Sequence, residues 1–381
     1  MKVAAIICEY NPFHKGHEYQ IARTRELCGA DFIVAIMSGN FVQRGDVAIF
    51  SKELRAKAAI ASGADLVIEL PTVFAMQSAE FFAKGGVSIA NALGIVDFLS
   101  FGAECDDVHQ LQEVAVFLSG EPAEFSAVLK EQLDKGMAYP AARAAAISRF
   151  LGSDAAELIS SPNNILAIEY CKALYTSGSG ITPVAVERKG VHHDSLNSSA
   201  GFASATHLRQ LIMSGKTDDA LLYIPNHCHE FFKDADVHCI AAMEKSIIAE
   251  LIKMPIEALA EICDVSEGME NRIKAAVIKA GTVGELADLI KTKRYTLSRI
   301  RRIILSAYLG ITDDLRRISV PYIKILDHNE KGQELISKMK KSASLPIVRN
   351  TSQINKLKNP EFKDFWERER VFDKLYEMFT L

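Results

Sequence analysis

The organisation of the chain follows from ten residues near its start, Cys8-Glu9-Tyr10-Asn11-Pro12-Phe13-His14-Lys15-Gly16-His17. A short apolar run, Val3 to Ile7, precedes them, and a segment with helical character, Glu18 to Leu27, follows them. The stretch therefore predicts a turn from a buried strand into a helix. At such a turn, the backbone N–H groups of the first helical turn converge on one spot and attract an anion. We expect an anion-binding site at the two histidines that flank Lys15 and Gly16.

The composition is that of a soluble globular protein. The 381 residues include 49% hydrophobic and 24% charged side chains, enough for a sizeable core in two or three domains. The formal net charge of −4 neither favours nor excludes a nucleic-acid partner, so any such site must be a local patch. Seven scattered cysteines fit a reducing compartment. We see no signal-peptide pattern and no apolar run of membrane-spanning length, and expect a cytoplasmic protein without membrane contact.

Short apolar runs alternate with helical patterns over the first two hundred residues. The runs are typical of buried parallel strands and lie at Val3–Cys8, Phe32–Met37, Leu66–Leu70, Val96–Phe101 and Ile181–Val186. The segments between them place apolar residues at three- and four-residue steps, as helices do: Ser51–Ser62, Ser78–Leu93, Val108–Leu118 and Asn163–Leu174. This alternation predicts an α/β fold, a Rossmann-like parallel sheet with helices on both faces. We assign it to residues 1–215, with a helical insertion at about 121–160.

Ligands of such sheets bind beyond the carboxyl ends of the strands. Polar residues follow the predicted strands there: Glu9 to His17, Ser38 to Asp46, and Glu187 to Gly190. The last of these loops leads to Ser204-Ala205-Thr206-His207-Leu208-Arg209, in which Ser204 is placed to cap a further helix. A hydroxyl, a helix N-terminus and a guanidinium together predict a polyphosphate cradle.

From about residue 216 helical periodicity dominates, and we assign residues 216–381 to a mainly helical domain. Its segment from Lys291 to Arg302 holds six basic residues and no acid. An aromatic side chain among cations favours RNA, and the candidate contacts are Lys293, Arg294, Tyr295, Arg299, Arg301 and Arg302. The alternative is a solvated helix face with Ile300 and Ile303 turned inward.

Two of these motifs resemble the signatures of a known superfamily. His14-Lys15-Gly16-His17 resembles the H-x-G-H motif of the nucleotidylyltransferases, and Ser204 to Arg209 resembles their second motif, S-[ST]-T-x-[IL]-R. Longer runs resemble the bacterial tRNA(Met) cytidine acetate ligases over nearly the whole chain: Glu9–His14, Ser38–Gly45, Ser161–Leu166 and Lys293–Thr296. Members of that family activate acetate with ATP to acetyl-adenylate and then acetylate N4 of the wobble cytidine of elongator tRNA(Met).

The resemblance implies roles for individual residues. His14 and His17 would donate to the α- and β-phosphate oxygens of ATP, and Arg209 with the Ser204–Thr206 turn would hold the β- and γ-phosphates. Gly16 would let the backbone approach the nucleotide. The remaining nucleotide contacts implied are Ile7, Cys8, Glu9, Tyr10, Asn11, Pro12, Phe13, Lys15, Gln20, Gly102, one of Asn163 and Asn164, and Arg188.

Acetate and the metal ion are less well specified by the sequence. Acetate requires a small pocket with one cation, for which Arg44 and Arg188 are both candidates. Mg²⁺ would accompany the triphosphate, but no carboxylate stands out as its ligand. The His and Cys residues between His227 and Cys239 fit no standard zinc spacing, so no protein-held metal site is predicted.

Two other functions stay open at this point. One is a small-molecule nucleotidylyltransferase that releases pyrophosphate, although such enzymes are usually far shorter than this chain. The other is an RNA-binding protein with an inactive nucleotide fold, against which the intact His14, His17, Ser204 and Arg209 argue. No obligate protein partner is evident from the sequence.

Overall fold

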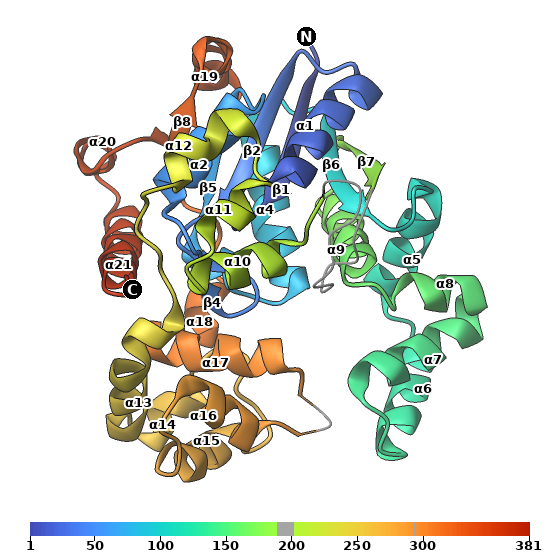
Figure 1. Cartoon of the computed structure of the whole chain (residues 1–381). Coiled ribbons are helices and arrows are strands. Elements are labelled where there is room, and N and C mark those ends of the chain that lie inside the picture. The colour runs from blue at the N-terminus through green and yellow to red at the C-terminus, as the bar shows by residue number, and fades with distance from the viewer. Residues whose placement is uncertain (189–201, 293–294) are drawn as a thin grey trace.

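The centre of the molecule is a seven-stranded sheet with the strand order β7-β6-β1-β2-β5-β8-β9 (Figure 1). The sheet is seen in a computed structural model that describes residues 1–188, 202–292 and 295–381. Its strands are β1 (Val3–Cys8), β2 (Phe32–Ser38), β5 (Leu66–Leu70), β6 (Phe98–Ala103), β7 (Thr182–Glu187), β8 (Ile323–His328) and β9 (Ile347–Val348). All five strands predicted from apolar runs are present, so the α/β prediction is confirmed.

The five predicted strands run parallel because a helical crossover follows each of the first four. Strand β1 pairs in parallel with β2 and β6, β2 with β5, and β6 with β7. The crossover helices are α1 (Lys15–Cys28), α2 (Lys52–Ala61), α3 (Thr72–Ala75), α4 (Ala79–Leu93), α5 (Val108–Gly120) and α9 (Pro162–Thr176).

Side chains along the central strands alternate between two hydrophobic cores. On β1, Val3, Ala5 and Ile7 face a core shared with α4 and α9, whereas Ala4 and Ile6 face a second core shared with α1 and α2. A strand that is covered on both faces needs apolar residues at every position. This is the physical reason that continuous apolar runs marked these strands in the sequence.

Two excursions leave the regular alternation of strands and helices. A short hairpin of β3 (Phe41–Val42) and β4 (Asp46–Val47) follows β2 where the sequence predicted only a polar loop. Phe41 is fully buried there and packs edge-on against Tyr376 and Phe379. Between α5 and α9, the chain adds three helices that extend away from the sheet, α6 (Ala123–Asp134), α7 (Tyr139–Leu151) and α8 (Ser153–Leu158) (Figure 1).

The second half of the chain is mainly helical. Helices α10 (Ala205–Met213), α11 (Thr217–Leu221) and α12 (His229–Phe232) pack into the second core, so the predicted boundary at residue 215 falls between helices that share that core. Short 3-10 helices span Asn226–Cys228 and Ile240–Met243. A helical group then lies beyond the carboxyl ends of the parallel strands (Figure 1): α13 (Glu244–Lys253), α14 (Ile256–Ala260), α15 (Met269–Val277), α16 (Val283–Ile290), α17 (Leu297–Leu309) and α18 (Asp313–Arg316).

After this group the chain returns to the sheet, which the sequence analysis did not predict. Strand β8 pairs antiparallel with β5, and β9 pairs parallel with β8. Along the first half of β8, buried residues alternate with half-buried ones such as Lys324. The strand therefore lacks the continuous apolar run by which the five other strands were predicted. The chain ends with α19 (Glu330–Ser342), α20 (Thr351–Lys356) and α21 (Pro360–Glu377).

A buried cluster of charges fastens the last helix to the sheet. The ammonium of Lys52 lies 2.7 Å from Glu69 and 2.5 Å from Asp373 of α21, and Lys324 of β8 lies 2.5 Å from the other oxygen of Glu69. These ion pairs join α2, β5, β8 and α21, elements that are distant in the sequence. None of the helices in the described part of the chain is long and apolar enough to cross a membrane.

Candidate active site

His14 and His17 form the cap of α1. Nδ1 of His14 accepts the N–H of Gly16 at 3.0 Å, and Nδ1 of His17 accepts the N–H of His14 at 3.3 Å, a reciprocal capping box. The two rings are stacked, with their centroids 3.7 Å apart. Because each Nδ1 accepts a hydrogen bond, the proton of each neutral ring lies on Nε2, which can donate to an anion.

Gly16 leaves the space that the ring of His14 needs. A Cβ atom at position 16 would lie 2.8 Å from Cε1 and 3.0 Å from Nδ1 of His14. Any side chain here would therefore displace the capping imidazole. The family resemblance implies that this glycine lets a nucleotide approach closely, and the structure adds a second reason, the room that the ring of His14 needs.

Arg209 joins the two sequence motifs. Its Nη1 donates to the carbonyl oxygen of Asn11 at 2.8 Å, and its Nη2 donates to Oγ1 of Thr206 at 3.2 Å. Ser204 caps α10, since its Oγ accepts the N–H of His207 at 3.1 Å. The predicted cradle of hydroxyl, helix N-terminus and guanidinium is therefore assembled beside the histidine cap.

A cavity of about 270 Å³ opens between these motifs, at the carboxyl ends of the parallel strands. Most of the predicted contacts line it: Ile7, Cys8, Glu9, Tyr10, Asn11, His14, His17, Gln20, Arg44, Gly102, Asn163, Arg188, Ser204, Thr206, Arg209 and Arg301. Gly16 lines a small adjoining hollow together with the two histidines. These residues come from seven different segments of the sequence and meet around one space.

The structure separates the roles of two adjacent asparagines at the start of α9. Oδ1 of Asn164 accepts the N–H groups of Glu104 and Cys105, at 2.9 and 3.1 Å, and so fixes the loop after β6. Asn163 lines the cavity, and its Nδ2 donates to the Glu104 carboxylate at 2.5 Å. Of the two candidates, Asn163 is the one placed to meet a ligand.

Arg188 and Gly102 belong to the same wall of the cavity. A Cβ atom at Gly102 would lie 3.3 Å from Cγ of Arg188, so the glycine leaves room for the arginine side chain. Burial lowers the pKa of the Arg188 guanidinium, and the Glu104 carboxylate opposes that shift. A cation that lines a cavity is suited to an anionic ligand.

Cys8 lines the cavity but is not a nucleophile. Burial raises the pKa of its thiol far above the usual range, while a hydrogen bond with Tyr10 acts in the opposite direction. The reactive form of cysteine is the thiolate, which this environment suppresses. The thiol lies against the carbonyl of Ile36, at 3.8 Å, and packs the end of the strand.

Four of the predicted nucleotide contacts line neither the cavity nor the adjoining hollow but lie beside residues that do: Pro12, Phe13, Lys15 and Asn164. The ammonium of Lys15 donates to the carbonyl oxygen of Leu222 at 2.7 Å and so fixes α1 to the end of α11. The ring of Phe13 packs edge-on against Tyr10, with the centroids 4.9 Å apart, behind the histidine cap.

The basic segment predicted to bind RNA is partly engaged within the protein. Arg299 donates to the carbonyl oxygen of Asp264 at 2.8 Å and stacks on Tyr295, whose hydroxyl donates to Glu267 at 2.8 Å. Arg302 lies 3.6 Å from the Asp264 carboxylate. Lys293 and Arg294 lie outside the described residues. RNA binding by this segment stays a prediction.

Sequence reasoning missed part of the cavity wall. Apolar and aromatic side chains of α4, β6 and α9 line it, together with residues of the β3–β4 hairpin and of α10: Val42, Gln43, Asp46, Phe82, Phe101, Leu166, Tyr170 and Ala205. The apolar ones look in the sequence like ordinary core residues, so no local signal marks them. They give the cavity an apolar side beside its cationic one.

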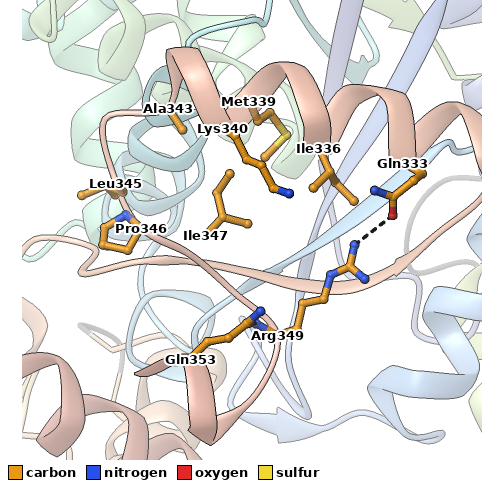
Figure 2. A pocket seen from close by; sticks show the side chains of 10 residues that line it. All are labelled: Gln333, Ile336, Met339, Lys340, Ala343, Leu345, Pro346, Ile347, Arg349 and Gln353. Atoms are coloured by element: carbon orange, nitrogen blue, oxygen red, sulfur yellow. Dashed lines mark hydrogen bonds between the residues drawn. The ribbon is translucent and has the colours of Figure 1, made fainter. Parts of the chain in front are cut away.

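A second hollow, of about 450 Å³, lies at the far edge of the sheet between α19, β9 and α20 (Figure 2). Its polar groups come mostly from exposed side chains, and Arg349 donates to Gln333 across it at 3.4 Å. None of the motif residues lines this hollow, so we assign the chemistry to the cavity at the strand ends. Among the described residues, no group of three or more His, Cys, Asp or Glu side chains is arranged to hold a metal ion.

Comparisons with known proteins identify relatives over the full length of the chain. A family model described as HIGH Nucleotidyl Transferase matches residues 1–380. A tRNA(Met) cytidine acetate ligase of Acetivibrio thermocellus is 41% identical over 394 residues, which cover 99% of this chain and 95% of the relative. One of Clostridium perfringens is 36% identical, over 96% of this chain and 93% of the relative.

Solved structures agree with the sequence comparisons. The apo crystal structure of Thermotoga maritima TmcAL superposes with a TM-score of 0.93 at 32% identity, covering 100% of this chain and 95% of that one. The crystal structure of the same protein bound with alpha-thio ATP superposes with a TM-score of 0.90, at the same identity and coverage. The chain therefore belongs to the tRNA(Met) cytidine acetate ligase family of the HIGH nucleotidyl transferases.

Proposed function

We propose that the protein is an ATP-dependent ligase that activates acetate as acetyl-adenylate and acetylates N4 of the wobble cytidine of elongator tRNA(Met). The observation that carries the proposal is the link made by Arg209 between the histidine motif and the Ser204 motif around one cavity. The named relatives support this function over a small-molecule nucleotidylyltransferase and over an inactive RNA-binding protein. A cytoplasmic location, where ATP and tRNA are both present, is part of the proposal.

In the first step a carboxylate oxygen of acetate attacks the α-phosphorus of ATP, and pyrophosphate leaves. Negative charge moves onto the phosphate oxygens, and the Nε2–H groups of His14 and His17 would stabilise it by donating hydrogen bonds. Arg209 and the N-terminus of α10 would hold the β- and γ-phosphates. Mg²⁺ fits this step as a companion of the triphosphate rather than as an ion held by the described carboxylates.

In the second step the exocyclic amine of cytidine attacks the acetyl carbonyl carbon. A C–N bond forms, the bond to the phosphate oxygen breaks, AMP leaves and the amine loses a proton. A mixed anhydride is already reactive, so holding the amine beside it supplies much of the rate. Arg44 is our candidate for the acetate carboxylate, because it lines the same cavity as His14 and His17 and lies on the β3–β4 hairpin, which follows the neighbouring strand β2.

The test combines two measurements on the purified protein. Incubation with ATP, isotopically labelled acetate and elongator tRNA(Met), followed by mass spectrometry of the nucleosides, should give labelled N4-acetylcytidine. Acetate should also stimulate ATP–pyrophosphate exchange without tRNA. Exchange that requires a phosphorylated metabolite would instead favour the small-molecule enzyme, and the absence of any exchange would favour the inactive RNA-binding protein.

Replacement of Arg44 tests the acetate site. Arg44→Ala should raise the acetate concentration needed for half-maximal exchange by about tenfold, the loss of roughly one charge-assisted hydrogen bond. The KM for ATP should change much less. An effect on ATP alone would assign Arg44 to the nucleotide.

A further inference from the structure

We propose that Arg301 of helix α17 contacts the polyphosphate of the bound nucleotide, so that the cavity is complete only when α17 is docked on the β3–β4 hairpin. The inference rests on the proposed function only in taking ATP as the ligand. It moves Arg301 from the predicted RNA surface to the nucleotide cavity. It also assigns the helical group a direct part in nucleotide binding.

The docking of α17 is seen most clearly at Gly45, the glycine that turns the hairpin. Its φ of +71° lies in the left-handed region, and a Cβ atom there would lie 2.3 Å from the backbone nitrogen of Arg302 and 2.5 Å from the carbonyl carbon of Arg301. Only glycine permits two backbones to approach this closely. The hairpin and the first turns of α17 are therefore in direct contact.

Neighbouring arginines on α17 point in different directions, because successive helical residues are rotated by about 100°. Arg302 turns toward the helical group, with its Nε 3.6 Å from Asp264, and its Nη1 donates to the carbonyl oxygen of Gln43 at 3.5 Å. Arg301 instead lines the nucleotide cavity. Within the part of the chain that the structure describes, its guanidinium makes no hydrogen bond or ion pair.

The carboxylate of Asp46, on the hairpin, relates the position of Arg301 in the cavity to that of Arg209. Burial raises the pKa of this carboxyl, and both Arg209 and Arg301 oppose the shift by their positive charge. Asp46, Arg209 and Arg301 line the same cavity, so both guanidinium groups act on the same carboxylate. Arg209 belongs to the motif placed to hold the β- and γ-phosphates, so Arg301 approaches the polyphosphate end of the ligand rather than the base.

The charges around the cavity are consistent with a polyphosphate. Among the described lining residues, four arginines face two carboxylates, those of Glu9 and Asp46. A triphosphate carries about four negative charges at neutral pH, and arginine is well suited to bind phosphate through charge-assisted hydrogen bonds. Removal of Arg301 would leave three lining arginines to balance the charge of the triphosphate, and none of the three belongs to the helical group.

The experiment measures nucleotide binding by calorimetry in the absence of acetate and tRNA. Arg301→Ala should weaken ATP binding by about 10- to 100-fold, as expected for the loss of a hydrogen bond from a charged donor. AMP binding should change by less than about threefold, because AMP lacks the β- and γ-phosphates. Arg301→Lys should restore part of the ATP affinity.

Arg317→Ala is the matched control, since this exposed arginine follows α18 in the same helical group and, among the described residues, pairs with Asp313. It should bind ATP as the wild-type protein does. Gly45→Ala should reproduce the ATP defect of Arg301→Ala by pushing α17 away from the hairpin. Thermal unfolding of each variant separates this effect from loss of the fold.

Three outcomes would overturn the inference. Unchanged ATP affinity of Arg301→Ala, with weaker tRNA binding, would return Arg301 to the RNA surface. Equal losses for ATP and AMP would place it away from the polyphosphate. Failure of the wild-type protein itself to bind ATP would remove the proposed function as well, whereas ATP binding that is insensitive to Arg301 would remove this inference alone.

Discussion

At the scale of single residues, the two histidines of the first motif cap helix α1 and also present hydrogen-bond donors to the cavity. Each imidazole uses Nδ1 to accept a backbone N–H at the start of α1, that of Gly16 for His14 and that of His14 for His17, which leaves Nε2 as its donor. The same hydrogen bonds that stabilise the helix start therefore fix the tautomer that the proposed phosphate contact requires. A variant can be designed to separate the two parts.

His17→Ala should reduce the rate of acetate-dependent exchange by at least about 100-fold, the effect of removing one hydrogen-bond donor from a developing charge. It should lower the free energy of unfolding by only about 1 kcal/mol, the value of a lost cap. His17→Gln can still accept the N–H of His14 through its amide oxygen and should recover stability without full activity. Exchange kinetics and urea unfolding measure the two quantities, and near-normal turnover of His17→Ala would contradict the role at phosphate.

Gly16→Ala tests the space for His14 by a change that should favour the helix itself. Alanine is the better helix former by about 1 kcal/mol. Its Cβ would nevertheless meet the His14 ring at 2.8 Å and displace it. We expect exchange activity to fall by at least tenfold while the melting temperature stays within a few degrees of wild type. Full activity of this variant would show that the cap geometry is not needed.

At the scale of elements, the start of α9 shows how adjacent residues take different tasks. Asn164 fixes the loop after β6 by accepting two backbone N–H groups, whereas Asn163 lines the cavity. The sequence could not choose between them, because both fit the first turn of a helix. The choice depends on the rotation of α9 against β6.

We therefore expect replacement of Asn164 to affect mainly stability and replacement of Asn163 to affect mainly ATP binding. Asn164→Ala leaves two backbone donors without their partner and should lower the free energy of unfolding by about 2 kcal/mol, with ATP affinity nearly unchanged. Asn163→Ala should lower the free energy of unfolding by less than Asn164→Ala does and should weaken ATP binding severalfold. Denaturant unfolding and calorimetry distinguish the two, and equal effects of both variants on ATP would contradict the assignment.

The basic segment at the start of α17 is a second case at this scale. Its cations were predicted as one RNA surface because they are contiguous in the sequence. In the folded chain Arg299 and Arg302 turn toward Asp264, while Arg301 turns toward the nucleotide cavity. Helical rotation divides a continuous run of charge among different surroundings.

At the scale of the whole molecule, the C-terminal helix α21 returns to the sheet and brings a buried carboxylate, Glu369, and a half-buried one, Asp373. Glu369 accepts the N–H of Thr72 at 3.1 Å, next to the cluster of Lys52, Glu69 and Asp373. Burial, followed by the negative charge of Glu69, raises the pKa of Glu369 to about 7. A carboxyl whose pKa is higher in the folded than in the unfolded state stabilises the fold at acid pH and loses that contribution as the pH rises through 7.

Glu369→Gln should therefore stabilise the protein at pH 8 and leave its stability at pH 4.5 nearly unchanged. The glutamine oxygen can still accept the N–H of Thr72 but carries no charge. We expect a gain of about 2 kcal/mol in the free energy of unfolding at pH 8. Urea unfolding at the two pH values provides the measurement.

The matched control is Glu367→Gln, on the same helix but exposed and paired with Arg370. It should change stability little at either pH. A Glu369→Gln variant that is no more stable than wild type at pH 8 would show that the carboxylate is accommodated without cost.

The sequence by itself determined the five parallel strands, their helices, and the histidine and Ser204 motifs at two helix starts. These follow from local rules, since a strand buried on both faces must be apolar throughout and a capped helix start must carry specific residues. Only the tertiary structure decided that β8 and β9 complete the sheet, that Asn163 rather than Asn164 lines the cavity, and that Arg301 lines the same cavity as Arg209. Those outcomes depend on which distant segments pack together and on the rotation of each helix, and neither is written in a local pattern.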